Sequence, residues 1–217
     1  MKARRDGPVA PRLDDELDAH TIDELDDEDS FEELDLRGEL AGAAAQDITF
    51  NRCRLSGVRL TAAELTRLRL VDCVLDTCDL SGAFLEASSW QRVRLHGCRL
   101  SGAVLSMATL RDVVLTDCRA DALTLRMATA EHLSVTGSDL VRADLQGIRL
   151  TSARWADCDL SGVDVSQAKL DDVQFARCEV TDLRGALALA GTTIDAGMTV
   201  PVALGLLGAL GITVDDD

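Results

Sequence analysis

An apolar residue recurs at every fifth position over most of this chain. From Leu40 to Val180, all 29 positions at this spacing are apolar, and 19 of them are Leu. The residue two positions before each of them is never charged, so the charges fall on the other three positions. Neither a helix of 3.6 residues per turn nor a two-residue strand alternation keeps every fifth residue inside over such a run. A bend in each group of five residues would keep every fifth residue inside.

Glycines two positions after the central apolar residue indicate how many sides the structure has. Because turn residues stack from coil to coil, their spacing should equal the length of one coil. Most of these glycines form two series whose members differ by multiples of twenty: Gly42, Gly82, Gly102 and Gly162, and Gly57, Gly97 and Gly137. Twenty residues per coil means four groups of five residues and four sides.

Three segments of this stretch carry a family resemblance. Cys78-Asp-Leu-Ser-Gly82, Ala143-Asp-Leu-Gln-Gly147 and Cys158-Asp-Leu-Ser-Gly162 resemble the A(D/N)LXX unit of the pentapeptide-repeat family. The resemblance covers residues 36–185 and implies that family's fold, a right-handed quadrilateral β-helix. We therefore expect an all-β solenoid of about seven coils. The handedness follows from the resemblance alone, because the spacing does not set it.

Residues 186–217 are expected to cap the last coil. Pro201 suits the first turn of a helix and Gly211 its end, which predicts a short helix at about 200–210. The arrangement resembles the quinolone-resistance pentapeptide proteins, in which a helix after the last coil pairs two subunits. The resemblance makes a homodimer a candidate assembly, through Val202, Leu204, Leu207 and Leu210.

Residues 1–35 differ sharply in charge from the repeats. They hold 14 Asp and Glu against 4 Lys and Arg, whereas residues 36–185 hold 20 against 18, a net charge of −2. So acidic a composition seldom folds alone, and we expect a disordered acidic tail. Two alternatives stay open: a short helix around residues 13–19, or a cap on the first coil formed by the Phe31–Leu36 segment.

The two ends of the chain also bear on location. No apolar segment typical of a secretory signal follows Met1, so a cytoplasmic location is expected. The stretch from Ala196 to Val214 carries no charge, but its Gly, Pro and Thr residues dilute its hydrophobicity and no basic flank anchors it. We expect a cap there and not a membrane span.

The seven cysteines all fall two positions before a central apolar residue, so they should point inward. No His or carboxylate shares these positions, and one thiol per coil does not supply a tetrahedral metal site. His96 and His132 fall on outer positions, so no catalytic pair forms. We expect no enzyme activity, metal or cofactor, and interpret these residues as structural core cysteines: Cys53, Cys73, Cys78, Cys98, Cys118, Cys158 and Cys178.

The outer positions define one candidate interaction surface. The face centred on Leu140 and Leu160 carries a modest acidic stripe: Asp121, Asp139, Asp159, Glu179 and Asp182. A second face mixes both signs, which is ordinary for a solvated surface: Arg52, Arg69, Arg92, Arg149 and Lys169 with Asp72, Asp112, Asp171 and Asp172.

Two functions fit these features. The favoured hypothesis is a non-catalytic protein-interaction scaffold whose partner docks on a solenoid face or is recruited by the acidic tail. The alternative comes from the resemblance: a DNA mimic that binds DNA gyrase or another topoisomerase and modulates or protects it, as in fluoroquinolone resistance. Mimicry would rest on the acidic stripe, the Asp215–Asp217 tail and the N-terminal acids. It needs a sustained anionic surface, which a nearly neutral repeat body supplies poorly. No direct nucleic-acid binding is expected.

Overall fold

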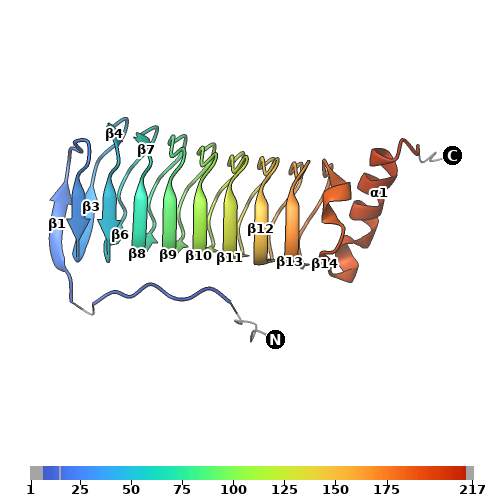
Figure 1. The fold of residues 1–217 in the computed structure, drawn as a ribbon, viewed down its shortest axis with the longest axis horizontal. Helices are drawn as coiled ribbons and strands as arrows, with labels where there is room; N and C mark the ends of the chain where they lie inside the picture. Colours follow the sequence, from blue (N-terminus) through green and yellow to red (C-terminus); the bar gives the residue numbers. More distant parts are fainter. Residues whose placement is uncertain (1–6, 15, 214–217) are drawn as a thin grey trace.

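The computed structural model describes residues 7–14 and 16–213 and shows a parallel β-solenoid of about nine turns with a short helix at its C-terminal end (Figure 1). The strands are β1 (Asp18–Ile22), β2 (Ser30–Glu32), β3 (Leu34–Gly38), β4 (Ala44–Gln46), β5 (Thr49–Asn51), β6 (Arg54–Ser56), β7 (Glu64–Thr66), β8 (Arg69–Asp76), β9 (Ser89–His96), β10 (Thr109–Thr116), β11 (Thr129–Thr136), β12 (Arg149–Ala156), β13 (Lys169–Ala176) and β14 (Thr193–Ile194). The helices are the 3₁₀ turns η1 (Ala186–Leu189) and η2 (Ala196–Met198) and the α-helix α1 (Thr199–Ala209).

From Glu39 to Arg184, the residues that pair between neighbouring coils lie twenty positions apart and run in parallel. Leu110 of β10, for example, lies beside Ala130 of β11. The long strands β8 to β13 each cover two sides of a coil, and single bridges such as Arg99–Arg119 and Val104–Thr124 form the other two. The predicted solenoid with four pentapeptides per coil is therefore confirmed. We name its sides after the central residues of one coil: the Leu140, Leu145, Leu150 and Trp155 faces.

The corners explain the recurring glycines. The residue two after each central position has a left-handed backbone, with φ of 65° at Gly82 and 56° at Asp112. Glycine adopts this conformation without steric cost, which is why it is frequent there. Non-glycine residues occupy many other corners, so the fold imposes the conformation even where the residue type disfavours it.

The interior consists of stacked layers of apolar side chains. Of the central positions from Leu40 to Val180, only Leu170 is not fully buried. Trp90 and Trp155 are 2% and 1% exposed, and the ring of Trp155 contacts that of Phe175 at a centroid distance of 6.2 Å. The prediction that the central residue of each group of five points inward is therefore correct. A bend in every group turns the same position toward the core in each coil.

The N-terminal segment differs from its expectation. Strand β1 pairs in parallel with β3 and β2 with β5, and Phe31 stacks on Phe50 at 5.0 Å. The expected disordered tail over residues 1–35 is therefore wrong for this part of the chain. The alternative helix around residues 13–19 is also wrong, since the described residues there are extended and enter β1. The other alternative agrees with the structure, because the Phe31–Leu36 segment supplies residues of β2 and β3, which pair with β5 and β6 and cover that coil.

The register explains why these coils escaped the sequence pattern. Residues of β1 pair with residues 16 positions later, as Ile22 does with Gly38, and β2 and β3 pair with residues 19 positions later. The first coils are therefore shorter than twenty residues, and their apolar side chains fall out of phase with the later ones. They bring the solenoid to about nine turns, against the seven expected.

Helix α1 closes the other end, as predicted for residues 200–210. Val202 is buried against the last coil, and Gly205 lies so close that a Cβ atom there would be 3.3 Å from that of Ala186. Strand β14 adds one short parallel pairing, between Ile194 and Phe175. None of the helices in the described part of the chain has the length and apolar character needed to cross a membrane.

Candidate functional site

Three of the five predicted acidic residues lie in one row. Asp139 bridges to Asp159, and Asp159 bridges to Glu179, in parallel register along the Leu140 face. Successive side chains are therefore one coil apart, about 4.8 Å. We call these three residues the acidic column.

Local hydrogen bonds orient two of these carboxylates. Asp159 Oδ1 accepts a hydrogen bond from the backbone N–H of Ser161 at 2.9 Å, and Asp139 Oδ1 accepts one from Val141 at 3.0 Å. An Asp before a turn forms this contact with the residue two positions on. The same Asp that suits the repeat thus holds its charge at a fixed place on the surface.

The other two predicted acids lie off the column. Asp121 follows its central residue and accepts a hydrogen bond from Ser101 Oγ. Asp182 occupies a corner, with φ of 49°. The residue before Asp139 in the row is Arg119, so the continuous run of acids covers only the last three coils of this face.

An open groove runs beside the acidic column, at the corner between the Trp155 and Leu140 faces. Its walls include Gly137, Asp157 and Arg177 as well as the three column residues. Arg177 donates two hydrogen bonds of 2.6 Å to the Asp157 carboxylate, and these bonds lower the pKa of Asp157. The column therefore faces a shallow surface with one paired cation at its edge.

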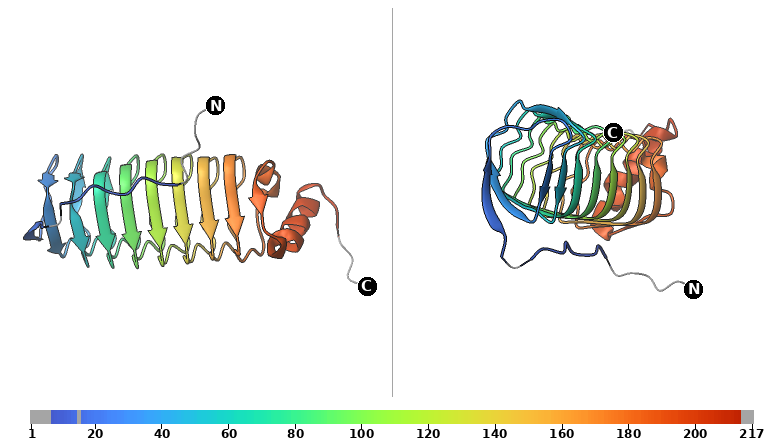
Figure 2. Two further views of the ribbon diagram at one scale, coloured as in Figure 1. Left: turned by 90° about the horizontal axis from the view of Figure 1, so that it is seen from below. Right: turned by 60° about the vertical axis from the view of Figure 1, so that its left-hand side comes forward.

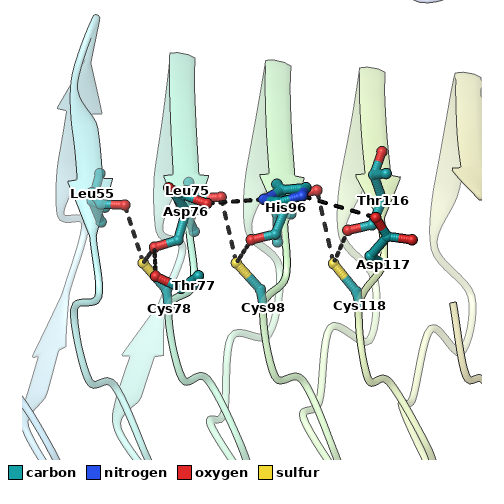
Figure 3. Close-up of polar contacts among 11 residues, drawn as sticks. Leu55, Leu75, Asp76, Thr77, Cys78, His96, Cys98, Thr116, Asp117 and Cys118 are labelled. Atoms are coloured by element: carbon teal, nitrogen blue, oxygen red, sulfur yellow. Dashed lines mark hydrogen bonds and ion pairs between the residues drawn. The ribbon is translucent and has the colours of Figure 1, made fainter. Parts of the chain in front are cut away.

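The cysteines lie in the core, where the five-residue period places them. Cys78, Cys98 and Cys118 form one row, and each thiol donates a hydrogen bond to a carbonyl of the preceding coil, as from Cys98 Sγ to Leu75 O at 3.4 Å (Figure 3). Burial raises the pKa of Cys73 to about 12. Because they are buried, these cysteines act as small apolar residues with weak donors. The seven are all buried and unpaired: Cys53, Cys73, Cys78, Cys98, Cys118, Cys158 and Cys178.

Within residues 7–14 and 16–213, no cluster of three or more His, Cys, Asp or Glu side chains could hold a metal ion. The surface histidine His96 lies between two carboxylates (Figure 3). Its Nδ1 is 3.0 Å from Asp76 Oδ1, and its Nε2 is 3.9 Å from Asp117 Oδ2. The hydrogen bond to Asp76 raises the pKa of His96. The imidazole ring of His96 therefore connects neighbouring coils on the Trp155 face.

A row of charged residues lies at the corner between the Leu150 and Trp155 faces. Asp72 and Asp112 are only 6% and 4% exposed, although each lies at a corner of the coil. Arg92 donates two hydrogen bonds of 2.6 Å to Asp72, and His132 Nδ1 lies 3.2 Å from Asp112 Oδ1. We call this row, which also includes Arg52, the corner column. The prediction of an ordinary solvated face is therefore wrong for Asp72 and Asp112. Other charged residues of that face are exposed, as expected: Arg69, Arg149, Lys169 and Asp171.

An extended N-terminal segment covers the corner column. The backbone N–H of Val9 donates to Asp112 Oδ1, and that of Arg12 donates to Asp72 Oδ1, both at 3.0 Å. Figure 2 shows the segment running along the rod, across the strands. Nothing in the repeat period predicts this contact. The only sequence signal is the recurrence of charged residues at one corner every twenty positions.

The predicted dimer residues of α1 divide into two groups. Val202 is buried, and Leu207 is half-buried. Leu204 and Leu210 are 51% and 63% exposed. The helix therefore uses one side to cap the solenoid and leaves large apolar side chains on another.

One comparison with known protein families finds the same repeats. A family model described as pentapeptide repeats matches eight copies, over residues 78–117 and 138–175. No curated protein matches the sequence significantly.

Two similar solved structures are distant in sequence. HetL, a pentapeptide-repeat protein involved in heterocyst differentiation regulation from the cyanobacterium Nostoc sp. strain PCC 7120, is 22% identical over 77% of this chain and 86% of its own, with a TM-score of 0.48. A trypsin-treated form of QnrB1, a plasmid-mediated fluoroquinolone resistance protein, is 19% identical over 92% of this chain and 98% of its own, with a TM-score of 0.37.

Proposed function

From the premise that this chain is a pentapeptide-repeat protein, we propose that it is a non-catalytic protein-interaction scaffold. Its docking face is the acidic column, Asp139, Asp159 and Glu179, and its partner is a protein with a basic surface. A flat solenoid face with charges at fixed spacing suits recognition of such a surface.

One observation supports this assignment above the others: three acids follow one another in the column, and none of the described ion pairs involves them. From Glu39 to Arg99 the signs alternate along the same row. Arg59 pairs with Glu39 at 3.0 Å, and Arg99 lies 3.9 Å from Asp79. Within the described residues, no ion pair reaches the three acids of the column. Like charges one coil apart repel each other. A cationic partner would relieve that repulsion, and the negative charges of the column would attract it.

The proposal is tested by removing the charge and keeping the shape. We would compare capture of proteins from the native host by the parent chain and by the triple variant D139N/D159N/E179Q. Asn keeps the oxygen that accepts the turn hydrogen bond, so the coils should remain intact. The control variant E64Q/E131Q/D171N makes the same charge change on other faces. Loss of one basic protein with the column variant alone supports the proposal, and equal capture by all three chains refutes it.

The DNA-mimic function is a second candidate, favoured by the same run of acids. A column of carboxylates on a rod presents charge in a line, as a phosphate backbone does. The exposed Leu204 and Leu210 would allow two subunits to pair through α1 and lengthen the rod. The Asp215–Asp217 tail invoked for this function lies outside the described residues.

A titration separates the two candidates. We would add the purified protein to a DNA gyrase supercoiling reaction, with and without a quinolone. Inhibition or drug protection that the column variant loses and the control variant keeps would favour mimicry. No effect at low micromolar protein would leave the scaffold function with a different partner.

A further inference from the structure

The corner column is shaped to hold an extended main chain. Residues 7–14 lie against it, and two hydrogen bonds from their backbone N–H groups reach it, from Val9 to Asp112 and from Arg12 to Asp72. Main-chain hydrogen bonds are largely independent of side-chain identity, as in other modes of binding extended peptides. Such a contact can therefore be made by more than one segment.

The spacing of the acceptors fits an extended chain. Asp72 and Asp112 are two coils apart, which is about 9.6 Å at the usual strand spacing. Three residues of an extended or polyproline chain span about 9 to 10 Å. The donors Val9 and Arg12 are three residues apart, so the two periods match. Pro8 and Pro11 precede the two donors and favour this extended backbone.

Charge also matches along the column. Arg12 contacts Asp72 through its N–H, and its positive charge contributes to the attraction at that carboxylate. At the next position of the column, Arg52 is held by Glu32 and Glu33, and Asp14 adds a third negative charge near it. A basic residue followed two positions later by an acidic one therefore fits this end of the column.

The two carboxylates are buried enough to need these donors. A buried charge is costly unless it is hydrogen-bonded, so a segment that leaves the column must be replaced by water or by another donor. The corner column is therefore a surface with two acceptors that a segment of the same chain covers.

We propose that the corner column is a docking groove for an extended, proline-containing segment of a partner protein, and that residues 7–14 occupy it in competition with that segment. The proposal deepens the scaffold function by naming a class of partner, and it concerns a different corner of the solenoid from the acidic column. Because residues 7–14 are tethered, they compete at a high effective concentration, and a partner segment must displace them.

The test uses the full chain and a defined probe. The variant V9P/R12P removes both N–H donors while keeping an extended backbone, so it should release the segment and leave the groove intact. The probe is a fluorescent peptide with the sequence of residues 7–14, followed by fluorescence anisotropy. We expect it to bind V9P/R12P at least about tenfold more tightly than it binds the parent chain, in which the tethered segment competes.

Two controls isolate the groove. The same peptide with N-methyl groups at its Val and Arg positions keeps every side chain and loses only the two donors, so it should not bind. Adding D112A to the released variant should abolish binding, whereas D117A, at an exposed residue of the next corner, should not. Melting temperatures show that the variants are folded.

Three results would overturn the proposal. They are absence of binding to V9P/R12P, equal binding of the N-methylated peptide, and a parent chain that forms dimers which V9P/R12P does not form. The last result would assign the groove to a second copy of the chain. None of these depends on the acidic column, whose capture assay would be unaffected.

Discussion

Arg92 donates two hydrogen bonds of 2.6 Å to the carboxylate of Asp72, across one coil of the solenoid. The two side chains are 18% and 8% exposed, so the pair is largely shielded from water. Burial raises the pKa of Asp72, but the hydrogen bonds from Arg92 and from the N–H of Arg12 outweigh it, and the pKa is lowered. The pair stabilises the corner that holds the N-terminal segment.

Breaking this pair should be costly. Arg92→Ala leaves a buried carboxylate without its main partner, and we expect a loss of about 3 kcal/mol in the free energy of unfolding. D72A/R92A should cost less than the two single changes together, measured by urea unfolding in a double-mutant cycle. Arg177→Ala breaks a pair of the same geometry at an exposed corner and should have a much smaller effect. Equal losses of unfolding free energy in Arg92→Ala and Arg177→Ala would contradict the idea that burial makes the Asp72–Arg92 pair more important.

The same pair predicts a pH dependence. Because the folded-state pKa of Asp72 is lowered, its contribution to stability is present above the unfolded value of about 4 and is lost as the pH falls through the folded value. Unfolding free energies of the parent chain and of Asp72→Asn should therefore converge in acid. A gap between the two proteins that stayed constant from neutral to acid pH would contradict the assigned charge.

The first coil depends on a glycine. A Cβ atom at Gly38 would clash with the carbonyl oxygen of Ile22 in β1, so Gly38→Ala should push β1 away from β3 and cost about 1–3 kcal/mol. Hydrogen exchange should show lost protection in β1 and unchanged protection in β8 to β13. Gly208→Ala in α1 is the control, since no atom lies within 4 Å of its Cβ position and its backbone is not left-handed. Full protection of β1 in Gly38→Ala would be inconsistent with the pairing described.

The core predicts a severe effect at Leu100, which is 1% exposed. Leu100→Asp would bury an unpaired charge between layers, and we expect a loss above about 4 kcal/mol or failure to fold. Leu204→Asp places the same charge on the exposed side of α1 and should be tolerated. Thermal unfolding compares them, and a Leu100→Asp melting temperature within a few degrees of the parent would refute the inward assignment.

The repeats could be predicted from the sequence because every coil buries side chains at the same two positions of each group of five residues. The positions of Leu100 and Cys98 follow from the period alone, and so does the acidic column, since each of its members precedes a central residue. Apart from the alternative of a cap formed by Phe31–Leu36, the first coils were not predicted, because their registers of 16 and 19 residues break the period. Coils shortened in this way leave no regular repeat in the sequence.

The corner column was missed for a different reason. Whether Asp72 is solvated depends on Arg92, twenty residues later, and on the N–H of Arg12, sixty residues earlier. The five-residue period assigns side chains to the inside or the outside of a coil. It does not say what covers the outside, and this depends on a segment that lies beyond the repeats.

The most direct test of the scaffold function places a photo-cross-linking residue beside the acidic column. Ser161, whose N–H donates to Asp159, is the test position, and the exposed Thr151 on the Leu150 face is the control. We predict that one basic protein of the native host cross-links at position 161, does not cross-link at position 151, and is lost in D139N/D159N/E179Q. Cross-linking at position 151 alone, or cross-linking at 161 that survives neutralisation of the column, would contradict the proposal.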